Sequence, residues 1–151
     1  CSLFAEALAF NGRNRRPPRD PVNACLSLGY TLVHFEAARA AYAAGLDSFL
    51  GFFHEIAFGR ESLACDLMEP VRPLVDAWVW EMFRSRALRP EHFTLDKGAC
   101  LLEKTGRARF YERFEPFMTS VARRFKGYCR VLARALRSQA PCLPVDEEED
   151  L

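Results

Sequence analysis

The chain lacks the short motifs that identify several large enzyme classes. No G-x-x-x-x-G-K-[ST] phosphate loop, G-x-S-x-G elbow or G-x-G-x-x-G turn occurs in its 151 residues, so nucleotide hydrolysis and serine chemistry have no support. His54 and Glu55 begin an H-E-x-x-H pattern, but Phe58 stands where the second histidine is needed. The zinc-protease mechanism that depends on both histidines is therefore excluded.

Features of membrane proteins and zinc knuckles are missing as well. The longest uncharged run, residues 22–35, is too short to span a bilayer, and no basic, apolar and small-residue signal peptide opens the chain. The six cysteines include no C-x-x-C pair and lie mostly in apolar segments, at positions 1, 25, 65, 100, 129 and 142. Such cysteines are typical of small buried side chains in a reducing compartment. We therefore expect a soluble, cytoplasmic protein without membrane contact.

The composition predicts one folded domain of the all-α class. Half of the positions are apolar and thirteen are phenylalanine, which suffices for the core of a single ordinary domain, placed at residues 1–140. No strand-rich or repeated unit occurs, so residues 93–102 form at most a small hairpin. Residues 141–151 hold an acidic run and are expected to be a disordered tail. The chain starts at Cys1 with neither an initiating methionine nor a helix cap, which predicts a fragment of a longer protein.

Capping residues and prolines place the expected helices. Asp20 followed by proline is an N-cap with proline at the first helical position, and Gly45 is a suitable end for the helix that follows. Ser62 is a good N-cap for another helix, in which two prolines predict a kink or break near Glu69 because each removes a backbone donor. We expect helices over residues 22–44, 62–86, 105–118 and 120–138.

An imidazole and several carboxylates lie close together in the sequence between residues 54 and 76. Asp66 and Glu69 are three positions apart, so both point from the same side of a helix, and His54 precedes a glycine-containing turn that can fold it back over them. Together they predict a site for a divalent cation. The alternative is a half-buried structural histidine and two carboxylates that pair with Arg60 and Arg72. His34 and His92 are expected to be structural or surface residues.

The positive charge is concentrated, although the net charge is only +1. Between Lys104 and Arg137 there are ten lysines and arginines against two glutamates. Four of the arginines form one stripe along a helix: Arg123, Arg130, Arg134 and Arg137. The apolar side chains expected on the opposite side of that helix are Val121, Phe125, Val131 and Leu132. A loop carries Arg13, Arg15, Arg16 and Arg19. A solvated amphipathic face is the alternative for the stripe, but with the arginine loop the pattern favours a nucleic-acid backbone.

Three segments carry a resemblance to a known family. They are RNRRPPRDPVNACLSLGYTL at 13–32, GLDSFLGFFHE at 45–55 and GRESLACDLMEPVRPLVD at 59–76. In order and spacing they resemble the C-terminal domain of the CRISPR-associated adaptation integrase, and the likeness extends to about Phe117. That family has an all-α domain with a metal site built from a glutamate, a histidine and a later acidic residue, and a β-rich N-terminal domain for dimerisation and partner assembly.

The resemblance implies roles for individual residues. His54 corresponds to the family's histidine and Glu69 to its later acid, so both are expected to bind Mg²⁺ or Mn²⁺, while Asp66 is either a ligand or a nearby base. The family's glutamate is expected upstream of Cys1, since Glu6 does not match it. The implied reaction is attack by the 3′-hydroxyl of a captured DNA on a phosphodiester of the CRISPR array. The implied partners are DNA, a second copy in the full-length protein and a small dimeric adaptation subunit.

Two hypotheses follow from the sequence. The first is a metal-dependent DNA integrase and endonuclease domain, nearly inactive alone because it lacks one ligand. The second is a non-catalytic helical DNA-binding or scaffolding module in which the carboxylates of Asp66 and Glu69 only pair with arginines. Loss of manganese binding in His54→Ala and Glu69→Ala separates the first hypothesis from the second.

Overall fold

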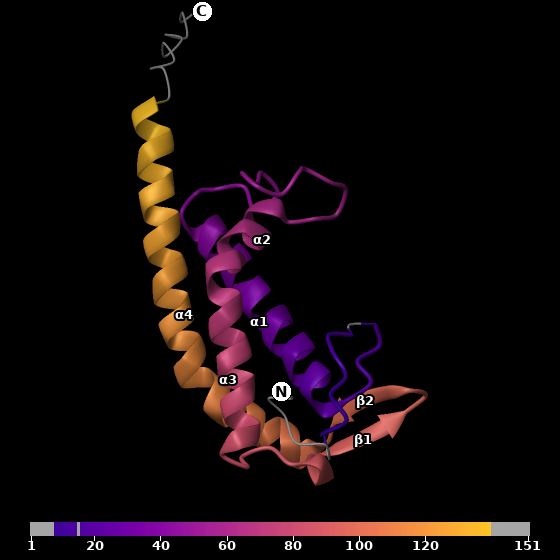
Figure 1. Ribbon diagram of the computed structural model, residues 1–151. Coiled ribbons are helices and arrows are strands. Elements are labelled where there is room, and N and C mark those ends of the chain that lie inside the picture. The colour runs from indigo at the N-terminus through magenta and orange to yellow at the C-terminus, as the bar shows by residue number, and fades with distance from the viewer. Residues whose placement is uncertain (1–7, 15, 140–151) are drawn as a thin grey trace, which may run out of the picture.

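The computed structural model of the chain describes residues 8–14 and 16–139 (Figure 1). The predicted acidic tail at 141–151 and Arg15 lie outside the described residues. The elements are four helices, two short 3₁₀ turns and one two-stranded antiparallel sheet among the described residues. The all-α prediction with a small hairpin is therefore confirmed.

Helix α1 (Pro21–Ala43) is the central element, and it packs against α2, α3 and α4. Its start follows the expected pattern, because the side chain of Asp20 accepts a hydrogen bond from the N–H of Asn23 at 2.8 Å and proline occupies the first turn. Gly45 follows its end with a φ of +74°, a left-handed conformation that glycine adopts without strain. The helix predicted from these caps is confirmed.

The second predicted helix is broken at Glu69, as its prolines indicated. Helix α2 (Ser62–Met68) is followed by the 3₁₀ turn Glu69–Val71 and then by α3 (Arg72–Arg84). Ser62 is not the N-cap, contrary to the prediction. It is the first helical residue, and its hydroxyl donates to the carbonyl of Glu55 at 2.9 Å instead of accepting from the helix.

Strands β1 (Phe93–Asp96) and β2 (Ala99–Leu102) form the hairpin, with Phe93 opposite Leu102. The two residues that join them have positive φ, as tight hairpin turns require. The N–H of Cys100 donates to the carbonyl of Pro18 at 2.7 Å, so the hairpin is attached to the arginine loop. His92, in the 3₁₀ turn Pro90–His92, is buried, and its Nδ1 accepts from the N–H of Arg89, which fits the structural role expected for it.

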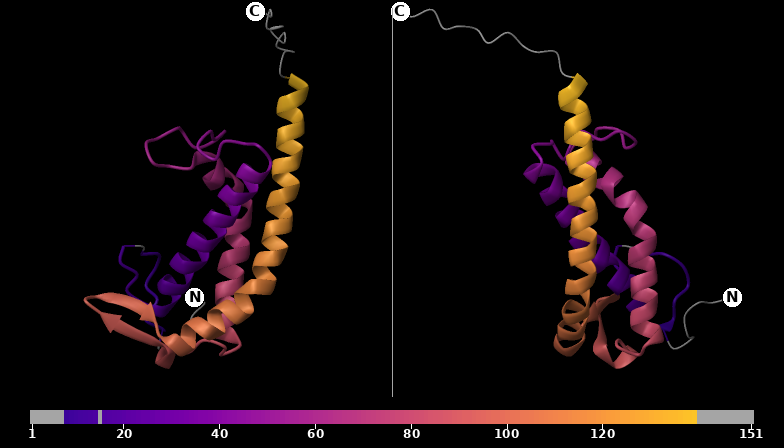
Figure 2. Two further views of the ribbon diagram at one scale, coloured as in Figure 1. Left: turned by 180° about the vertical axis from the view of Figure 1, so that it is seen from behind. Right: turned by 90° about the vertical axis from the view of Figure 1, so that its left-hand side faces the viewer.

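A single helix, α4 (Lys104–Gln139), replaces the two helices expected over 105–118 and 120–138. Pro116 lies inside it. A proline within a helix removes one backbone hydrogen bond and bends the helix without necessarily ending it, and Figure 2 shows that α4 changes direction along its length. The predicted break at residue 119 was wrong because the apolar face of α4 continues on both sides of that position.

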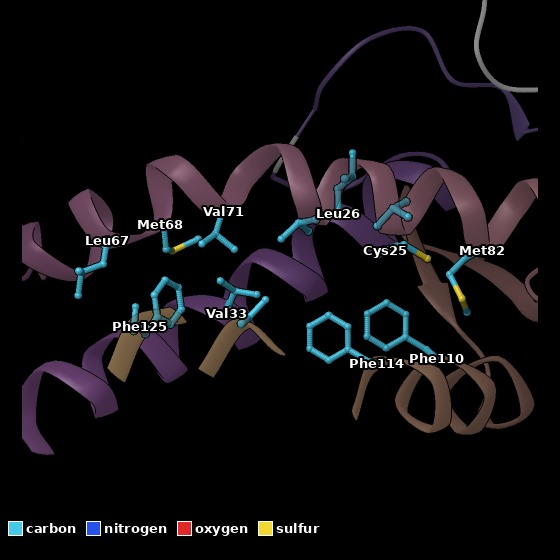
Figure 3. Packing of buried hydrophobic residues seen from close by; sticks show 14 of the residues in the cluster. Cys25, Leu26, Val33, Leu67, Met68, Val71, Met82, Phe110, Phe114 and Phe125 are labelled. Atoms are coloured by element: carbon cyan, nitrogen blue, oxygen red, sulfur yellow. The ribbon is translucent and has the colours of Figure 1, made fainter. Parts of the chain in front are cut away.

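The core lies where α1, α2–α3 and α4 meet (Figure 3). Trp78 of α3 stands edge-on to Phe110 and Phe114 of α4, with ring centroids 5.0 Å apart in each pair. The side chains that point into this core in Figure 3 include Cys25, Leu26, Val33, Leu67, Met68, Val71, Met82, Phe110, Phe114 and Phe125. Burial of this apolar surface stabilises the three-element packing.

Two further predictions concern which side chains are buried, and the structure departs from each of them. Val131, expected opposite the arginine stripe, is 68% exposed, because α4 buries Val121, Phe125, Cys129 and Ala133 at every fourth position and Val131 lies off that line. Cys25, Cys100 and Cys129 are buried as expected, whereas Cys65 is half-buried. Within the part of the chain that the structure describes, no helix combines the length and apolar character needed to cross a bilayer.

Candidate functional site

The segment 45–61, between α1 and α2, folds back over the start of α2 (Figure 1). Leu46 packs against the core, but the other large apolar side chains of the segment are exposed: Phe49, Leu50, Phe52, Phe53, Ile56 and Phe58. Hydrogen bonds also hold the segment. The N–H of Leu63 donates to the carbonyl of Ser48 at 2.9 Å, and the hydroxyl of Ser48 donates to Glu61 at 3.0 Å.

His34 of α1 completes this attachment, with its Nε2 2.8 Å from the second carboxylate oxygen of Glu61. The sequence indicated only a structural or surface role for His34. Its partner is 27 positions away, and nothing in the local pattern of either residue points to the other. The pair joins α1 to the segment that carries His54.

The carboxylate of Asp66 holds residues 52–54 with four hydrogen bonds. Its Oδ2 accepts the N–H groups of Phe52 at 2.5 Å and Phe53 at 3.0 Å. Its Oδ1 accepts the N–H of His54 at 3.1 Å and lies 2.5 Å from Nδ1 of the same residue. A carboxylate has about four acceptor positions, so Asp66 has none left for a cation in this arrangement.

These bonds define the charge state of Asp66 and the orientation of His54. Burial of the Asp66 carboxylate favours its protonated form, but the hydrogen bonds from the His54 side chain and from the three N–H groups outweigh burial, and the pKa of Asp66 is lowered. An ionised Asp66 accepts a proton-bearing Nδ1, which leaves Nε2 of a neutral His54 as a free acceptor or ligand atom.

Glu69 is the acid toward which His54 Nε2 is turned, at 3.9 Å from Oε1. The same oxygen is 3.0 Å from Nε of Arg72. Arg60 pairs with neither acid, because it donates to the carbonyl of Glu55 and to the hydroxyl of Ser62. Of the arginine pairs considered as an alternative, the structure therefore contains the one between Glu69 and Arg72, whereas Asp66 binds backbone and imidazole.

The donor set fits a hard cation only in part. No group of three His, Cys, Asp or Glu side chains converges to hold a metal within residues 8–14 and 16–139. His54 Nε2 and Glu69 Oε1 are nevertheless closer than the about 4.2 Å that separates opposite ligands with bonds of about 2.1 Å. Two protein ligands plus water are typical of Mg²⁺, which retains several waters in most sites.

The predicted DNA-contacting arginines lie on two sides of the molecule. The loop with Arg13, Arg16 and Arg19 and the C-terminal half of α4 are on opposite sides of α1 (Figures 1 and 2). The structure does not bring them together, but each borders the candidate site. Tyr128 and Leu132 of α4 share a groove with Phe52, Phe53 and Asp66, while the loop meets Arg72 in a cavity on the other side. The stripe residues Arg123, Arg130, Arg134 and Arg137 are exposed.

Comparison with known proteins gives concordant matches. A curated relative described as CRISPR-associated endonuclease Cas1 1, from Thermodesulfovibrio yellowstonii, is 43% identical over 136 residues, which are 89% of this chain and 43% of the relative. A solved structure of a casposase bound to integration product is 27% identical with a TM-score of 0.81, covering 99% of this chain and 46% of that one. A partial Cas6-RT-Cas1–Cas2 complex is 27% identical with a TM-score of 0.79, covering 91% and 45%.

This chain thus spans less than half the length of each of these proteins. Residues 2–116 match the family described as CRISPR associated protein Cas1. The resemblance carried by the arginine loop, the histidine segment and the acidic helix agrees with this match in both family and extent. Because the match covers most of its length, the chain belongs to the Cas1 family.

Proposed function

We propose that this chain is the helical, metal-binding part of a CRISPR adaptation integrase and endonuclease. The observation that carries the proposal is the convergence of His54 and Glu69, with Asp66 holding the imidazole so that Nε2 faces the carboxylate. His54 and Glu69 are the residues that would bind Mg²⁺ or Mn²⁺. Asp66 positions His54 and is not itself a ligand, because its acceptor positions are occupied.

The proposed reaction is a phosphoryl transfer between DNA strands. The 3′-hydroxyl oxygen of the incoming DNA forms a bond to phosphorus, and the bond from that phosphorus to the 3′-oxygen of the repeat strand breaks. The attacking hydroxyl loses its proton, and the departing oxygen gains one. A divalent cation held by His54 and Glu69 would lower the pKa of the attacking hydroxyl and would stabilise negative charge on the phosphoryl group and the leaving oxygen. No enzyme nucleophile is needed, and the sequence contains no motif for one.

DNA and protein partners follow from the charge and from the relatives. Arg13, Arg16 and Arg19, together with the α4 stripe, would contact phosphates, which gives affinity that decreases with salt and little sequence selectivity. The structural relatives include a casposase bound to integration product and a complex of Cas1 with Cas2. The complex that contains Cas2 supports a small adaptation subunit as partner. From the family resemblance we propose that this subunit is dimeric and that the full-length protein forms a homodimer.

A manganese titration tests the metal site directly. We expect His54→Ala and Glu69→Ala each to weaken Mn²⁺ binding at least tenfold, measured by electron paramagnetic resonance of free Mn²⁺. Glu81→Ala is the matched control, because Glu81 also pairs with an arginine three residues later, at 2.7 Å, but lies away from the histidine. Equal Mn²⁺ affinity in all three variants contradicts the proposed metal site.

The alternative of a non-catalytic DNA-binding or scaffolding module draws on the ion pair between Glu69 and Arg72. In that case the carboxylate of Glu69 is already neutralised by the guanidinium, and Glu69→Ala changes stability without changing Mn²⁺ affinity. Strand transfer by the isolated chain is expected to be nearly absent under the integrase proposal. Robust integration by residues 1–151 alone contradicts the view that a further ligand is supplied from outside this sequence.

A further inference from the structure

A cavity of about 390 Å³ lies between the arginine loop, α1 and the α2–α3 region. Its polar lining residues are Arg13, Arg16, Ser27, Tyr30, Thr31 and Arg72, together with His34. No carboxylate is among the described residues that line it. The cavity therefore presents positive charge and hydroxyl groups, whereas the neighbouring Glu69 and Asp76 are turned to Arg72 and Tyr30 from outside it.

Two arginines that line this cavity each lie close to the ring of Tyr30. The Cζ atoms of Arg13 and of Arg72 each lie 5.5 Å from the centroid of the Tyr30 ring. Arg13 reaches this position by donating to Asn23 Oδ1 at 2.7 Å and to the carbonyl of Asn14 at 2.8 Å. Because both arginines line the same cavity, an anion bound in it is attracted by two positive charges.

Arg72 is held more by charge than by hydrogen bonding. Its Nε is buried and has no hydrogen-bond partner among the described residues, although Glu69 Oε1 is 3.0 Å away, because the direction of approach is wrong for a bond. A buried donor without a partner costs free energy. Tyr30 and Glu69 thus anchor the guanidinium. The buried Nε cannot reach a ligand, so the terminal nitrogens of Arg72, which lines the cavity, are the donors left for an acceptor there.

The wall of the cavity is one face of α1. Ser27, Tyr30, Thr31 and His34 follow one another at helical spacing, so they line the same side. The Ser27 hydroxyl is 3.5 Å from both terminal nitrogens of Arg13. The face leads from the arginine loop to His34, whose partner Glu61 belongs to the segment that carries His54.

We propose that Arg13 and Arg72, supported by Tyr30, form a binding site for one non-reacting phosphate of a single DNA strand. The assignment to DNA rests on the proposed function. Arg72 links this pocket to the candidate metal site, because its partner Glu69 is the carboxylate that faces His54. Neighbouring phosphates of one strand would occupy the two sites together. The phosphate bound by Arg13 and Arg72 would fix the position of the strand while the phosphate at the metal site reacts.

Fluorescence anisotropy of a labelled oligothymidylate, with the whole chain in EDTA and over a series of KCl concentrations, tests this pocket. The variants are Arg13→Gln, Arg72→Gln and their combination. Arg84→Gln is the matched control, since Arg84 also pairs with a glutamate and lies against an aromatic ring. Thermal unfolding of each variant shows whether it is folded. If Arg72→Gln is unstable, Arg13→Gln still tests the pocket, because Arg13 lies in a loop.

We expect each single variant to weaken binding about tenfold, the loss of one charge-assisted contact. Because both arginines hold the same phosphate, the double variant is expected to be little weaker than either one. In the double variant, the slope of log K against log salt is expected to fall by roughly 0.7, the value for one phosphate of a single strand. If the variants bind the oligonucleotide as well as the Arg84→Gln control does, the pocket is wrong. It is also wrong if the two fold-losses multiply in the double variant and its slope changes by roughly 1.4, because the arginines then contact two different phosphates.

The source of the phosphate is tested in the same assay. Inorganic phosphate and thymidine monophosphate are added as competitors. If either displaces the oligonucleotide at concentrations near the dissociation constant of the oligonucleotide, the pocket is a free-anion site and the assignment to a DNA strand is wrong. Because EDTA removes divalent cations, this result is independent of the Mn²⁺ titration, so failure of the pocket and failure of the metal site are distinguished.

Discussion

His54 and Asp66 are joined twice, since both the ring Nδ1 and the backbone N–H of His54 approach the same carboxylate oxygen, at 2.5 and 3.1 Å. The second oxygen of Asp66 holds the two preceding N–H groups. One carboxylate therefore fixes the path of the chain and the rotation of the imidazole together. A substitution at Asp66 is expected to affect both stability and the candidate site.

We predict that Asp66→Asn lowers the free energy of unfolding by about 1–3 kcal/mol at neutral pH, because an amide has one acceptor oxygen and leaves N–H groups without a partner. The lowered pKa of Asp66 means that its contribution is present above the ordinary carboxyl pKa of about 3.9 and is lost as pH falls through the folded-state value. Urea unfolding of both proteins at several pH values measures this. A stability difference that persists unchanged in strong acid contradicts it.

Gly51 is the second residue on which the histidine segment depends. A Cβ atom at this position would lie 2.7 Å from Cβ of Ser62 and 2.9 Å from Asp66 Oδ2, closer than side-chain atoms approach each other. We predict that Gly51→Ala displaces residues 51–54 from Asp66 and weakens Mn²⁺ binding at least as much as Asp66→Asn does. Calorimetric titration of Mn²⁺ measures the loss.

The control for this substitution is Gly127→Ala. Gly127 is in α4, and a Cβ there meets no atom within 4 Å, so alanine is expected to stabilise the helix by about 0.5–1 kcal/mol without any change in metal binding. If Gly51→Ala binds Mn²⁺ as well as Gly127→Ala does, the close contact of segment 51–54 with Asp66 is not required for the site.

Local signals were sufficient for much of the fold. The caps of α1 and the break at Glu69 were predictable because each depends on residues that are adjacent in sequence, an aspartate before a proline in one case and two prolines in the other. The break predicted at residue 119, between two separate helices, was wrong because the local pattern does not show where packing continues. Phe110, Phe114, Val121 and Phe125 of α4 remain buried on both sides of residue 119, and this packing is visible only in three dimensions.

The candidate site was predictable in its members but not in its connections. His54, Asp66 and Glu69 come within reach of one another as their spacing and the family resemblance indicated. That Asp66 uses its whole carboxylate on residues 52–54 depends on the path of an irregular segment, for which the sequence has no periodic signal. Contacts between distant elements, such as those of Tyr30 with Arg13 and Arg72, were equally invisible.

Tyr30 provides a test of the contact between α1 and α3. Its hydroxyl donates to Asp76 at 2.6 Å. Burial, this hydrogen bond and the charge of Asp76 raise the pKa of Tyr30 to about 12, against the opposing effect of Arg72 and Arg13. A raised folded-state pKa stabilises the fold below the ordinary tyrosine value of about 10, and the stabilisation is lost as pH rises toward 12.

We predict that Tyr30→Phe is about 1 kcal/mol less stable than the natural chain at pH 8, because Asp76 loses its hydrogen bond. The difference shrinks when denaturant unfolding is measured at increasing pH above about 10. The phenylalanine preserves the ring beside the two arginines, so binding of the oligothymidylate is expected to change little. A stability difference that stays constant over this alkaline range contradicts the raised pKa of Tyr30.

The arginine stripe of α4 is expected to contact duplex DNA, because its four guanidinium groups are exposed on one side of the helix and pair with no acid among residues 8–14 and 16–139. We predict that the combination of Arg130→Gln and Arg134→Gln reduces the slope of log K against log salt for a duplex by up to about 1.8, the value for two phosphates. Arg113→Gln with Arg124→Gln removes the same charge from the same helix off the stripe. If this control reduces the slope equally, net charge and not the stripe determines binding, and the solvated amphipathic face is the correct interpretation.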